Sequence, residues 1–426
     1  MPSNRALAER AERFLVLAAV AGLVVIAFAF APGLETFRTA KEAVMRTQAI
    51  VSLFALAAAV AYGGSARLRE LLRERAAVAI LAGAVVWTAV TTLTSGYRRL
   101  SVESLVTVIC SVVLFVAVWY VAPNIPLMAL LVLAPVVVVN ALLAALQEYG
   151  IWNPFQFANA DVHLAATALI GNPNDVGGYL ALCTVVLLMA GAFLHGRLRW
   201  LAIGGGVGAL IGVFISQTRT AVLALAATAV FLALRRSWKA ALAIAGALLL
   251  ALLLATQVNL PVLTRLAHLP AYVAEGHWDV VFSNRLPAFA VAAAMFVDHP
   301  LLGVGPGAYK YFYFPYRVRL TETYPAEIMR GVGVNFAETH NDHLQLLAET
   351  GVPGYALFVA ACVVVALRTR RIDGVDDDRA QFAARLALPF VLMLLVLALA
   401  FFPLQIAVTR HLLVTVSALI LGWSRA

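Results

Sequence analysis

The chain is organised around the stretch Glu338-Thr-His-Asn-Asp-His-Leu-Gln-Leu-Leu-Ala-Glu-Thr-Gly-Val-Pro-Gly354, which closes a long, aromatic-rich and largely polar interval that begins at Arg285. Almost everywhere else the sequence consists of Ala, Leu and Val in long apolar blocks. A helix needs about 20 mainly apolar residues to cross the hydrocarbon core of a bilayer. The pattern therefore predicts a scaffold of membrane-spanning helices that holds the polar interval at one face of the membrane.

The composition excludes an ordinary soluble protein. Of the 426 residues, 63% are hydrophobic and 12% are charged, and the mean hydropathy is +0.90. Soluble globular domains contain about 45–50% apolar and about 25% charged residues. The sequence therefore predicts an all-α, polytopic integral membrane protein in which residues 1–426 form a single membrane domain.

The apolar blocks predict about twelve transmembrane helices. They are expected near residues 14–33, 47–63, 76–94, 103–122, 125–145, 176–194, 201–217, 220–234, 240–257, 352–367, 386–402 and 404–423. Residues 258–351 then form a large loop inserted between the ninth and tenth helices.

The distribution of Lys and Arg predicts the orientation of these helices. Basic residues gather in the short loops on the side of the N-terminus, such as 67–75 and 235–239. Cytoplasmic loops carry this excess, so we expect both termini in the cytoplasm, and the 258–351 loop and the connection Gln147–Asp175 on the periplasmic side. The same rule accounts for most of the net charge of +9. Since no basic patch with interleaved aromatic residues is seen, we expect membrane lipids rather than nucleic acid as partners.

The long loop contains three local patterns. Residues 286–297 carry apolar residues at helical spacing, which predicts a helix that lies on the membrane surface or re-enters the membrane. Gly303-Val-Gly-Pro-Gly307 predicts a turn-rich hinge. A nucleotide-binding loop is disfavoured there, because no strand precedes the glycines and Pro306 interrupts them. The aromatic block Tyr309–Tyr316 predicts an interfacial belt or, alternatively, a platform on which sugars stack.

His340 and His343 are the candidates for acid–base chemistry. They stand one helical turn apart if the tenth helix begins early, and Glu349 follows further along. Histidine titrates near the operating pH of most enzymes, so a general base fits this position. A metal site is disfavoured because no third ligand lies at a familiar offset and no cysteine is nearby. The remaining alternative is an interfacial histidine with satisfied hydrogen bonds.

Three arginines are candidates for binding an anionic group. Arg219, in Ile215-Ser-Gln-Thr-Arg-Thr220, lies between two apolar spans on the outer side, where an arginine at the edge of the hydrocarbon needs a partner. Arg285 is a second outward-facing guanidinium, and two such groups can bind a phosphate or pyrophosphate through bidentate hydrogen bonds. The alternative for Arg219 is a structural ion pair with Asp175. Arg410, in the last span, is a third candidate or a structural ion within the bundle.

Four segments resemble, in the same order, recurring pieces of the O-antigen ligase and polymerase superfamily. They are Asn172-Pro-Asn174, Ser216-Gln-Thr-Arg219, Arg285 followed by His299-Pro-Leu-Leu-Gly-Val-Gly-Pro-Gly307, and His340-Asn-Asp-His-Leu-Gln-Leu-Leu-Ala-Glu-Thr-Gly-Val-Pro-Gly354. The likeness covers roughly residues 165–365. The histidine segment is fairly specific for the superfamily and much less specific for one member.

The resemblance implies an inverting, metal-independent glycosyltransferase with a GT-C-like architecture in the bacterial inner membrane, with no cofactor. It implies that Arg219 and Arg285 hold the pyrophosphate of a glycan linked to undecaprenyl pyrophosphate. It also implies that His340 takes a proton from the acceptor hydroxyl, which attacks the anomeric carbon at the periplasmic face. The candidate supporting residues are His343, Asn341, Glu349, Asp175 and Arg410.

Within the superfamily we expect an O-antigen ligase, which joins O-polysaccharide to the lipid A-core of lipopolysaccharide. Protein O-oligosaccharyltransferases usually carry an extra C-terminal soluble domain, whereas this chain stops at Ala426, just past the last span. A polysaccharide polymerase that uses the same donor is the closest alternative, because only the acceptor separates the two. A polytopic transporter is disfavoured, since no convincing internal repeat is found.

Overall fold

The computed structural model describes residues 4–31, 37–155, 166–258, 261–322, 329, 336–370 and 377–424. These residues form helices and connecting loops, without a strand among them. The α-helices are α1 (Asn4–Phe28), α2 (Arg38–Gly63), α3 (Ala66–Leu72), α4 (Arg75–Thr94), α5 (Arg98–Val121), α6 (Leu133–Glu148), α7 (Pro173–Phe193), α8 (Gly196–Ile215), α9 (Arg219–Arg236), α10 (Trp238–Val258), α11 (Pro261–Ala267), α12 (Leu269–Ala274), α13 (Trp278–Val281), α14 (Leu286–Asp298), α15 (Tyr309–Thr321), α17 (Asp342–Ala366), α18 (Asp378–Leu397) and α19 (Ala407–Trp423). The 3₁₀ helices are η1 (Ala122–Asn124), η2 (Leu127–Val132) and η4 (Leu367–Arg370).

Nine of the described helical segments are long and apolar enough to cross a membrane, which agrees with a polytopic membrane protein. They are α1, α2, α4, α5 with η1, η2 with α6, α7, α8, α17 and α18. The other three predicted spans coincide with α9, α10 and α19. Helix α9 carries three arginines at its ends, and α10 and α19 contribute only shorter apolar stretches. The all-helical prediction is confirmed, whereas the count of twelve spans and the GT-C-like architecture remain predictions.

Helix α7 forms the centre of the bundle. It packs against α8, α9, α18 and α19, and most of its side chains are buried. Two glycines allow close approach near the N-terminal end of α7. An added Cβ at Gly177 would lie 2.4 Å from Thr218 Oγ1, and one at Gly178 would lie 2.4 Å from the ring of Phe401. The N-terminal end of α7 therefore packs directly against the segment before α9 and the segment after α18.

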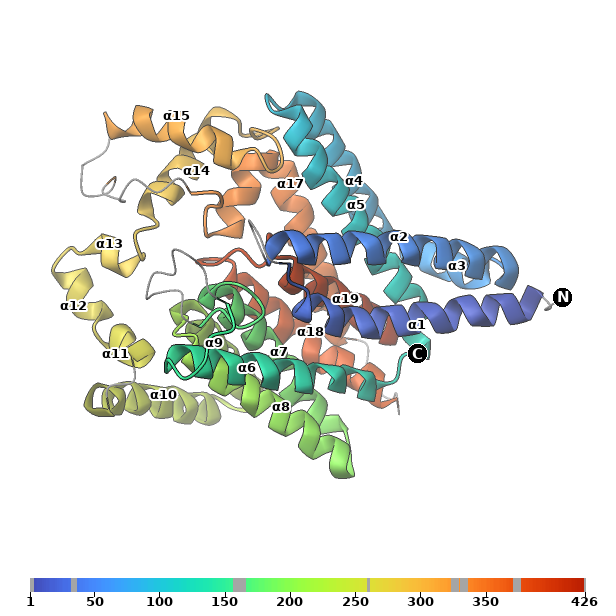
Figure 1. The fold of residues 1–426 in the computed structure, drawn as a ribbon, viewed down its shortest axis with the longest axis horizontal. Helices are drawn as coiled ribbons and strands as arrows, with labels where there is room; N and C mark the ends of the chain where they lie inside the picture. The colour runs from blue at the N-terminus through green and yellow to red at the C-terminus, as the bar shows by residue number, and fades with distance from the viewer. Residues whose placement is uncertain are drawn as a thin grey trace.

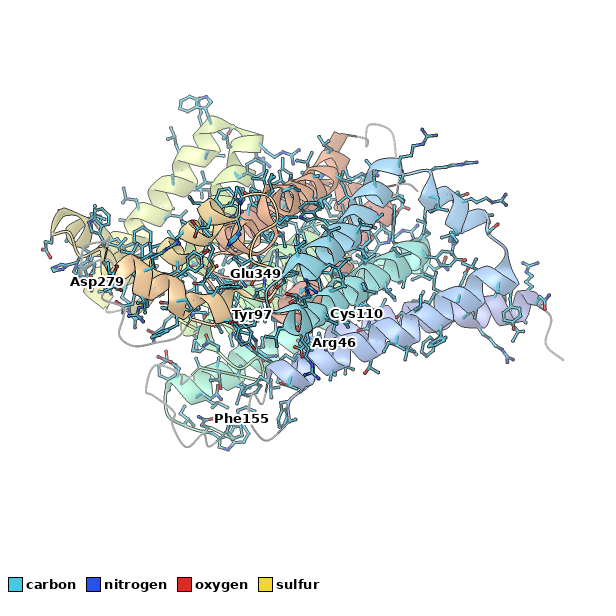
Figure 2. All side chains as sticks on the ribbon, turned by 90° about the horizontal axis from the view of Figure 1, so that it is seen from above. Arg46, Tyr97, Cys110, Phe155, Asp279 and Glu349 are labelled. Carbon is cyan, nitrogen blue, oxygen red and sulfur yellow. The ribbon has the colours of Figure 1, made fainter. Side chains whose placement is uncertain are left out.

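Helices α11 to α15 gather at the end of the molecule opposite the two chain termini, which lie on the same side (Figure 1). Tyr97, which precedes α5, packs its ring against Tyr311 and Phe312 of α15, with ring centroids 5.1 Å apart in each case. Figure 2 labels Tyr97 and Glu349 at this end of the bundle. The helix predicted over residues 286–297 is present as α14, which packs against α17. Its position relative to the membrane stays a prediction.

The long loop and the tenth span differ from the prediction at their boundary. Helix α17 begins at Asp342, whereas the hydropathy pattern placed the loop up to residue 351 and the span over 352–367. The helix breaks at Gly351, where φ is 65° and ψ is −172°. Hydropathy therefore located the apolar segment after the break. It missed the helical segment before the break because that segment carries several polar residues.

The last two spans are separated by a longer loop than the sequence indicated. The predicted spans 386–402 and 404–423 leave one residue between them, but α18 ends at Leu397 and α19 begins at Ala407. Residues 398–406, hereafter the 398–406 loop, read Ala-Leu-Ala-Phe-Phe-Pro-Leu-Gln-Ile. Their apolar character makes them resemble helix by hydropathy. They are apolar because the loop packs inside the protein, with Phe401 and Phe402 buried.

Candidate functional site

His340 lies in a tight turn directly before α17. Its φ is 56°, in the left-handed region that residues other than glycine rarely adopt. The buried side chain of Thr339 fixes the turn, because its Oγ1 accepts a hydrogen bond from the Asn341 backbone N–H at 3.0 Å. The Asn341 side chain caps α17 by accepting from the Leu344 N–H at 3.0 Å. The turn thus presents the His340 side chain at the head of α17, outside the helix itself.

The environment of His340 favours the neutral imidazole. The ring packs edge-on against Phe336 and Phe402, with centroids 5.7 and 4.6 Å away. Its Nδ1 atom is buried and has no hydrogen-bond partner. Burial, followed by the positive charges of Arg285 and Arg38, lowers the pKa of His340 to about 3. At neutral pH the ring is therefore uncharged, as a proton acceptor must be.

Arg285 lies directly before α14 and faces the same region. Its Nη1 donates a hydrogen bond to the backbone oxygen of Ala400 in the 398–406 loop. Burial, followed by the positive charge of Arg219, lowers its pKa to about 10. Arg285 therefore remains a cation at neutral pH. Ala400 belongs to the loop whose Phe402 packs on His340, and Arg219 bonds to Ser283, two residues before Arg285. The three predicted site residues are therefore linked through shared neighbours.

Arg219 is the first residue of α9, and it reaches across to the turn that follows α13. Its Nη2 donates to the backbone oxygen of Val280 at 3.2 Å and to Ser283 Oγ. The neighbouring Thr218 donates through Oγ1 to the backbone oxygen of Pro173 at 3.0 Å, which joins the segment before α9 to the start of α7.

Asp175 is not the partner of Arg219. Both residues are described by the structure, and no ion pair joins them. The structural pairing considered from the sequence is therefore wrong. Asp175 is only 3% exposed, and its Oδ1 has no hydrogen-bond partner. The charged side chains that act on Asp175 are Arg38 and Glu338, and Arg219 is not among them.

The 398–406 loop wraps around the head of α17. Four hydrogen bonds attach it to the predicted site and its neighbours. They run from Asn341 Nδ2 to Leu399 O at 2.9 Å, from Asp342 N to Ala398 O at 3.0 Å, from Leu404 N to Asp342 Oδ2 at 2.8 Å, and from Arg285 to Ala400 O. The 398–406 loop therefore contacts His340, the Asn341 cap and Arg285.

Arg38 and Phe402 are site neighbours that sequence reasoning missed. Arg38, the first residue of α2, pairs with Glu338 at 2.6 Å, and its guanidinium carbon lies 5.5 Å from the centre of the Phe402 ring. The available signals were a basic residue on the side where basic residues are disfavoured, and Phe402-Pro403, since proline rarely continues a helix.

Glu349 is hydrogen-bonded to the glycine-rich turn. Its carboxylate accepts hydrogen bonds from the backbone N–H groups of Gly307 and Tyr309 at 2.9 and 3.2 Å, and Gln345 donates to it at 3.4 Å. Gly303, Gly305 and Gly307 all have positive φ, so the predicted turn-rich segment is confirmed. Glu349 holds this turn at the start of α15.

The break at Gly351 completes the same connection. It leaves backbone oxygens near the break without partners inside the helix. Val304 N donates to Ala348 O at 2.9 Å and Gly305 N to Glu349 O at 3.0 Å. A side chain at Gly351 would collide with the Leu301 backbone oxygen, 2.1 Å from an added Cβ. The two glycine-containing motifs identified in the sequence are thus built against each other.

His343 and Arg410 are engaged within the protein. The His343 ring nitrogens lie 3.1 Å from Tyr355 Oη and 3.1 Å from the backbone oxygen of Leu395, which ties α17 to α18. The expected spacing of one helical turn between the two histidines is wrong, because the residue at 340 is not helical. Arg410 pairs with Glu42 of α2, which fits its interpretation as a structural ion within the bundle.

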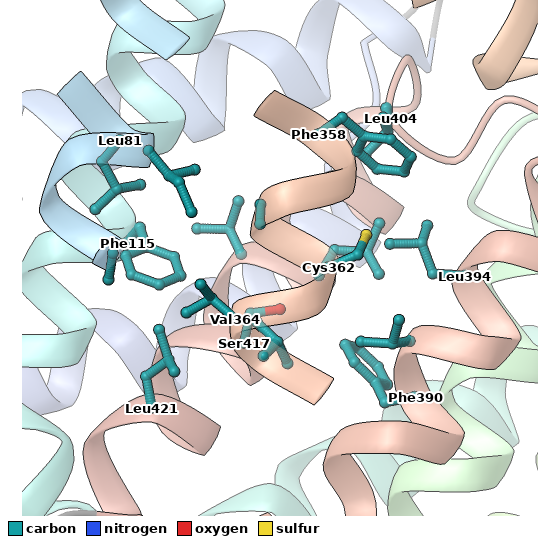
Figure 3. A pocket seen from close by; sticks show the side chains of 17 residues that line it. Leu81, Phe115, Phe358, Cys362, Val364, Phe390, Leu394, Leu404, Ser417 and Leu421 are labelled. Atoms are coloured by element: carbon teal, nitrogen blue, oxygen red, sulfur yellow. The ribbon is translucent and has the colours of Figure 1, made fainter. Parts of the chain in front are cut away.

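A cavity of about 210 Å³ lies among α4, α5, α17, α18 and α19, with Leu404 of the 398–406 loop in its lining (Figure 3). Its described lining is apolar apart from Cys362 and Ser417 and carries no charged side chain. It offers no group for proton transfer or for binding an anion.

The arrangement joins a neutral base to two fixed cations. A neutral imidazole can accept a proton from a hydroxyl group, and guanidinium groups stabilise negative charge that develops on a leaving group. Together they suit a reaction in which a hydroxyl attacks and an anion departs.

Comparison with protein families agrees with this chemistry. Residues 204–359 match the family model Wzy_C, described as O-antigen ligase, whereas no curated protein matches the chain. The match contains Arg219, Arg285 and His340, and it ends before the 398–406 loop. The resemblance to the O-antigen ligase and polymerase superfamily is therefore confirmed.

Proposed function

Because residues 204–359 match the family model described as O-antigen ligase, we propose that this protein is an O-antigen ligase. It transfers O-polysaccharide from undecaprenyl pyrophosphate to a sugar hydroxyl of the lipid A-core, at the periplasmic face of the bacterial inner membrane. The observation that carries the proposal is a chain of contacts. Arg219 bonds to Ser283, two residues before Arg285, and Arg285 bonds to Ala400 in the loop whose Phe402 packs on His340.

Arg219 and Arg285 are the proposed ligands of the donor diphosphate. A guanidinium has five N–H groups in a planar fork that matches phosphate oxygens. The contacts of Arg219 with Val280 and Ser283, and of Arg285 with Ala400, use only part of this capacity. Both side chains are aimed by these contacts and keep donors for a ligand. Two guanidiniums offset the charge of a diphosphate better than one, since each bidentate pair is charge-assisted.

His340 is the proposed base. Its imidazole takes the proton of the acceptor hydroxyl while the hydroxyl oxygen attacks the anomeric carbon from the face opposite the diphosphate. The bond from the anomeric carbon to the diphosphate oxygen breaks, and the electron pair leaves with undecaprenyl pyrophosphate. The new glycosidic bond therefore has inverted configuration. The growing negative charge on the leaving group is stabilised by the two arginines.

A reconstituted transfer assay tests this function. Purified protein in lipid is mixed with O-polysaccharide linked to undecaprenyl pyrophosphate and with lipid A-core. We expect glycosylated lipid A-core and free undecaprenyl pyrophosphate, with inversion at the anomeric carbon detected by NMR. The proposal fails if no glycan is transferred while vesicles that contain the protein move the lipid-linked donor across the membrane, because that result describes a transporter.

Gene deletion distinguishes the ligase from a polymerase. Loss of a ligase leaves full-length polysaccharide on undecaprenyl pyrophosphate and lipid A-core without it. Loss of a polymerase instead leaves single repeat units on the carrier lipid or on the core. Electrophoresis of lipopolysaccharide together with mass spectrometry of the carrier-linked glycans reads out both quantities, and an accumulation of single repeats would assign the polymerase activity.

A further inference from the structure

The 398–406 loop contacts three parts of the proposed catalytic site at once. Ala400 accepts the hydrogen bond of Arg285, Leu399 accepts the hydrogen bond of the Asn341 cap, and the Phe402 ring packs on His340. Arg285 lies 55 residues before His340, and the loop lies after both His340 and Asn341 in the sequence. Their relative positions therefore depend on a connection between the last two spans that lies outside the family match.

Phe402 has a particular position within this loop. It is 3% exposed, and its ring centre lies 4.6 Å from the His340 ring centre at an interplanar angle of 78°. The Arg38 guanidinium carbon lies 5.5 Å from the same ring centre. Phe402 thus contacts both the imidazole and a cation that pairs with Glu338. An edge-on aromatic contact restricts the orientation of the imidazole plane.

Among the residues that the structure describes, the ring of His340 packs against two aromatic neighbours, Phe336 and Phe402. Its Nδ1 is buried without a hydrogen-bond partner, so the ring orientation is not fixed there in the way that a carboxylate fixes the histidine of a catalytic triad. Packing against Phe336 and Phe402 takes that role, and the Phe402 contact is the closer of the two.

We propose that the 398–406 loop positions the catalytic groups for glycosyl transfer, and that Phe402 is the positioning residue that orients the His340 imidazole next to Arg285. This inference rests on the proposed function. Phe402 itself touches neither reacting atom. It acts through His340, and a displaced base loses rate steeply, since a misplacement of about 1 Å can cost roughly 100-fold.

Phe401 supplies a matched control. It is the adjacent phenylalanine of the same loop, 1% exposed, and its ring centre lies 5.2 Å from that of Phe402. It packs against Gly178 of α7 rather than against His340. Phe401→Leu and Phe402→Leu therefore remove the same atoms from the same buried loop, but only Phe402→Leu removes the ring that contacts the base.

The experiment measures kcat, the donor KM and the thermal unfolding midpoint for both variants in the reconstituted transfer assay. We expect kcat of Phe402→Leu to fall by about 10- to 100-fold, with a donor KM close to that of the wild type, because the diphosphate ligands stay in place. Phe401→Leu should lower the unfolding midpoint by a similar amount and leave kcat within about threefold of the wild type.

Equal kcat values for the two leucine variants would overturn the inference, as would a Phe402→Leu effect confined to donor KM or to stability. If Phe402→Leu does not fold, Phe402→Met is measured against Phe401→Met. Methionine fills most of the volume without a ring, and the same difference in kcat is expected. A wild-type protein that transfers no glycan would refute the proposed function instead, so the two failures are distinguishable.

Discussion

Two histidines at the head of α17 share one motif and have opposite surroundings. His343, in the first turn of the helix, has both ring nitrogens within 3.1 Å of polar partners, Tyr355 and Leu395. His340, in the turn before the helix, has a buried Nδ1 without a partner and lies near Arg285 and Arg38. The residue type is the same, but only the side chain in the turn retains unused hydrogen-bonding capacity.

The difference teaches which polar groups of the motif hold the fold and which are left for a ligand. Buried polar groups in native proteins are nearly always hydrogen-bonded, so an exception needs a reason. Glu349, like His343, is among the groups that hold the fold, because its carboxylate accepts hydrogen bonds from the backbone N–H groups of Gly307 and Tyr309. His340 and Asp175 share a different property, since each has a buried side-chain atom without a hydrogen-bond partner. Variants of both kinds test this division.

The largest effect is expected from the base. His340→Gln should lower kcat by about 100- to 10,000-fold, the contribution typical of general acid–base catalysis, which corresponds to about 3–5 kcal/mol of transition-state stabilisation. Donor binding should be retained, because the base acts on the acceptor. Kinetics and donor-binding titration in the reconstituted system measure both. Full turnover of this variant would contradict the distinction between His340 and His343, since His340 would then be a packing residue.

Arg285 should follow in size. Arg285→Lys keeps the charge but loses the bidentate fork, and the loss of a preorganised donor to a developing anion costs about 100- to 1,000-fold in kcat. We also expect a raised donor KM. Arg319→Lys serves as the control, because Arg319 pairs with Asp298 on the exposed side of α15. Equal kcat and donor KM for the two lysine variants would contradict a role for Arg285 in donor binding.

The pH profile gives a smaller and more specific test. Burial and the charges of Arg285 and Arg38 lower the pKa of His340 to about 3, so protonation of this base limits kcat/KM only at very acidic pH. Arg38→Gln removes one of these charges and raises the pKa of His340. The acid limb of kcat/KM should therefore move to higher pH.

Arg98→Gln is the control for this profile, since Arg98 is an exposed first residue of α5 and is not among the charges that act on His340. An unshifted acid limb for Arg38→Gln would mean that its guanidinium does not reach the base.

The smallest effect on activity is expected at the second histidine. His343→Phe leaves the Leu395 oxygen and the Tyr355 hydroxyl without this partner, which should cost about 1–3 kcal/mol of stability while kcat stays within about threefold of the wild type. Thermal unfolding in detergent and the transfer assay measure the two quantities. A large loss of kcat in a protein of unchanged stability would reverse the roles assigned to the two histidines.

The sequence predicted the helical fold and the order of its apolar segments, because burial in lipid demands long apolar helices that satisfy their own backbone. It failed where apolar residues form a loop. The 398–406 loop has the hydropathy of a span, and its backbone oxygens are satisfied by Arg285 and Asn341, which come from distant segments. A residue-by-residue scale cannot register such long-range partners.

The sequence indicated the charged and titratable residues of the candidate site, but it did not indicate the residues that pack around them. Arg219, Arg285 and His340 stand out because charge and titratable groups are rare in an apolar chain. Phe402 does not stand out in the sequence, since a phenylalanine within an apolar run is the ordinary case. The pairing of Arg219 with Asp175 failed for a related reason. Proximity to the same membrane face does not determine which polar groups meet.

The 398–406 loop also limits how far the chain could be shortened from its C-terminus before the proposed site loses contacts. A protein truncated after Ala366 would retain the whole segment matched by the family model and every arginine proposed to bind the donor. It would lack the oxygens of Leu399 and Ala400 and the ring of Phe402. During synthesis His340 would therefore reach this orientation only after α18 and α19 have been made, so the proposed activity would be among the last properties that the nascent chain acquires.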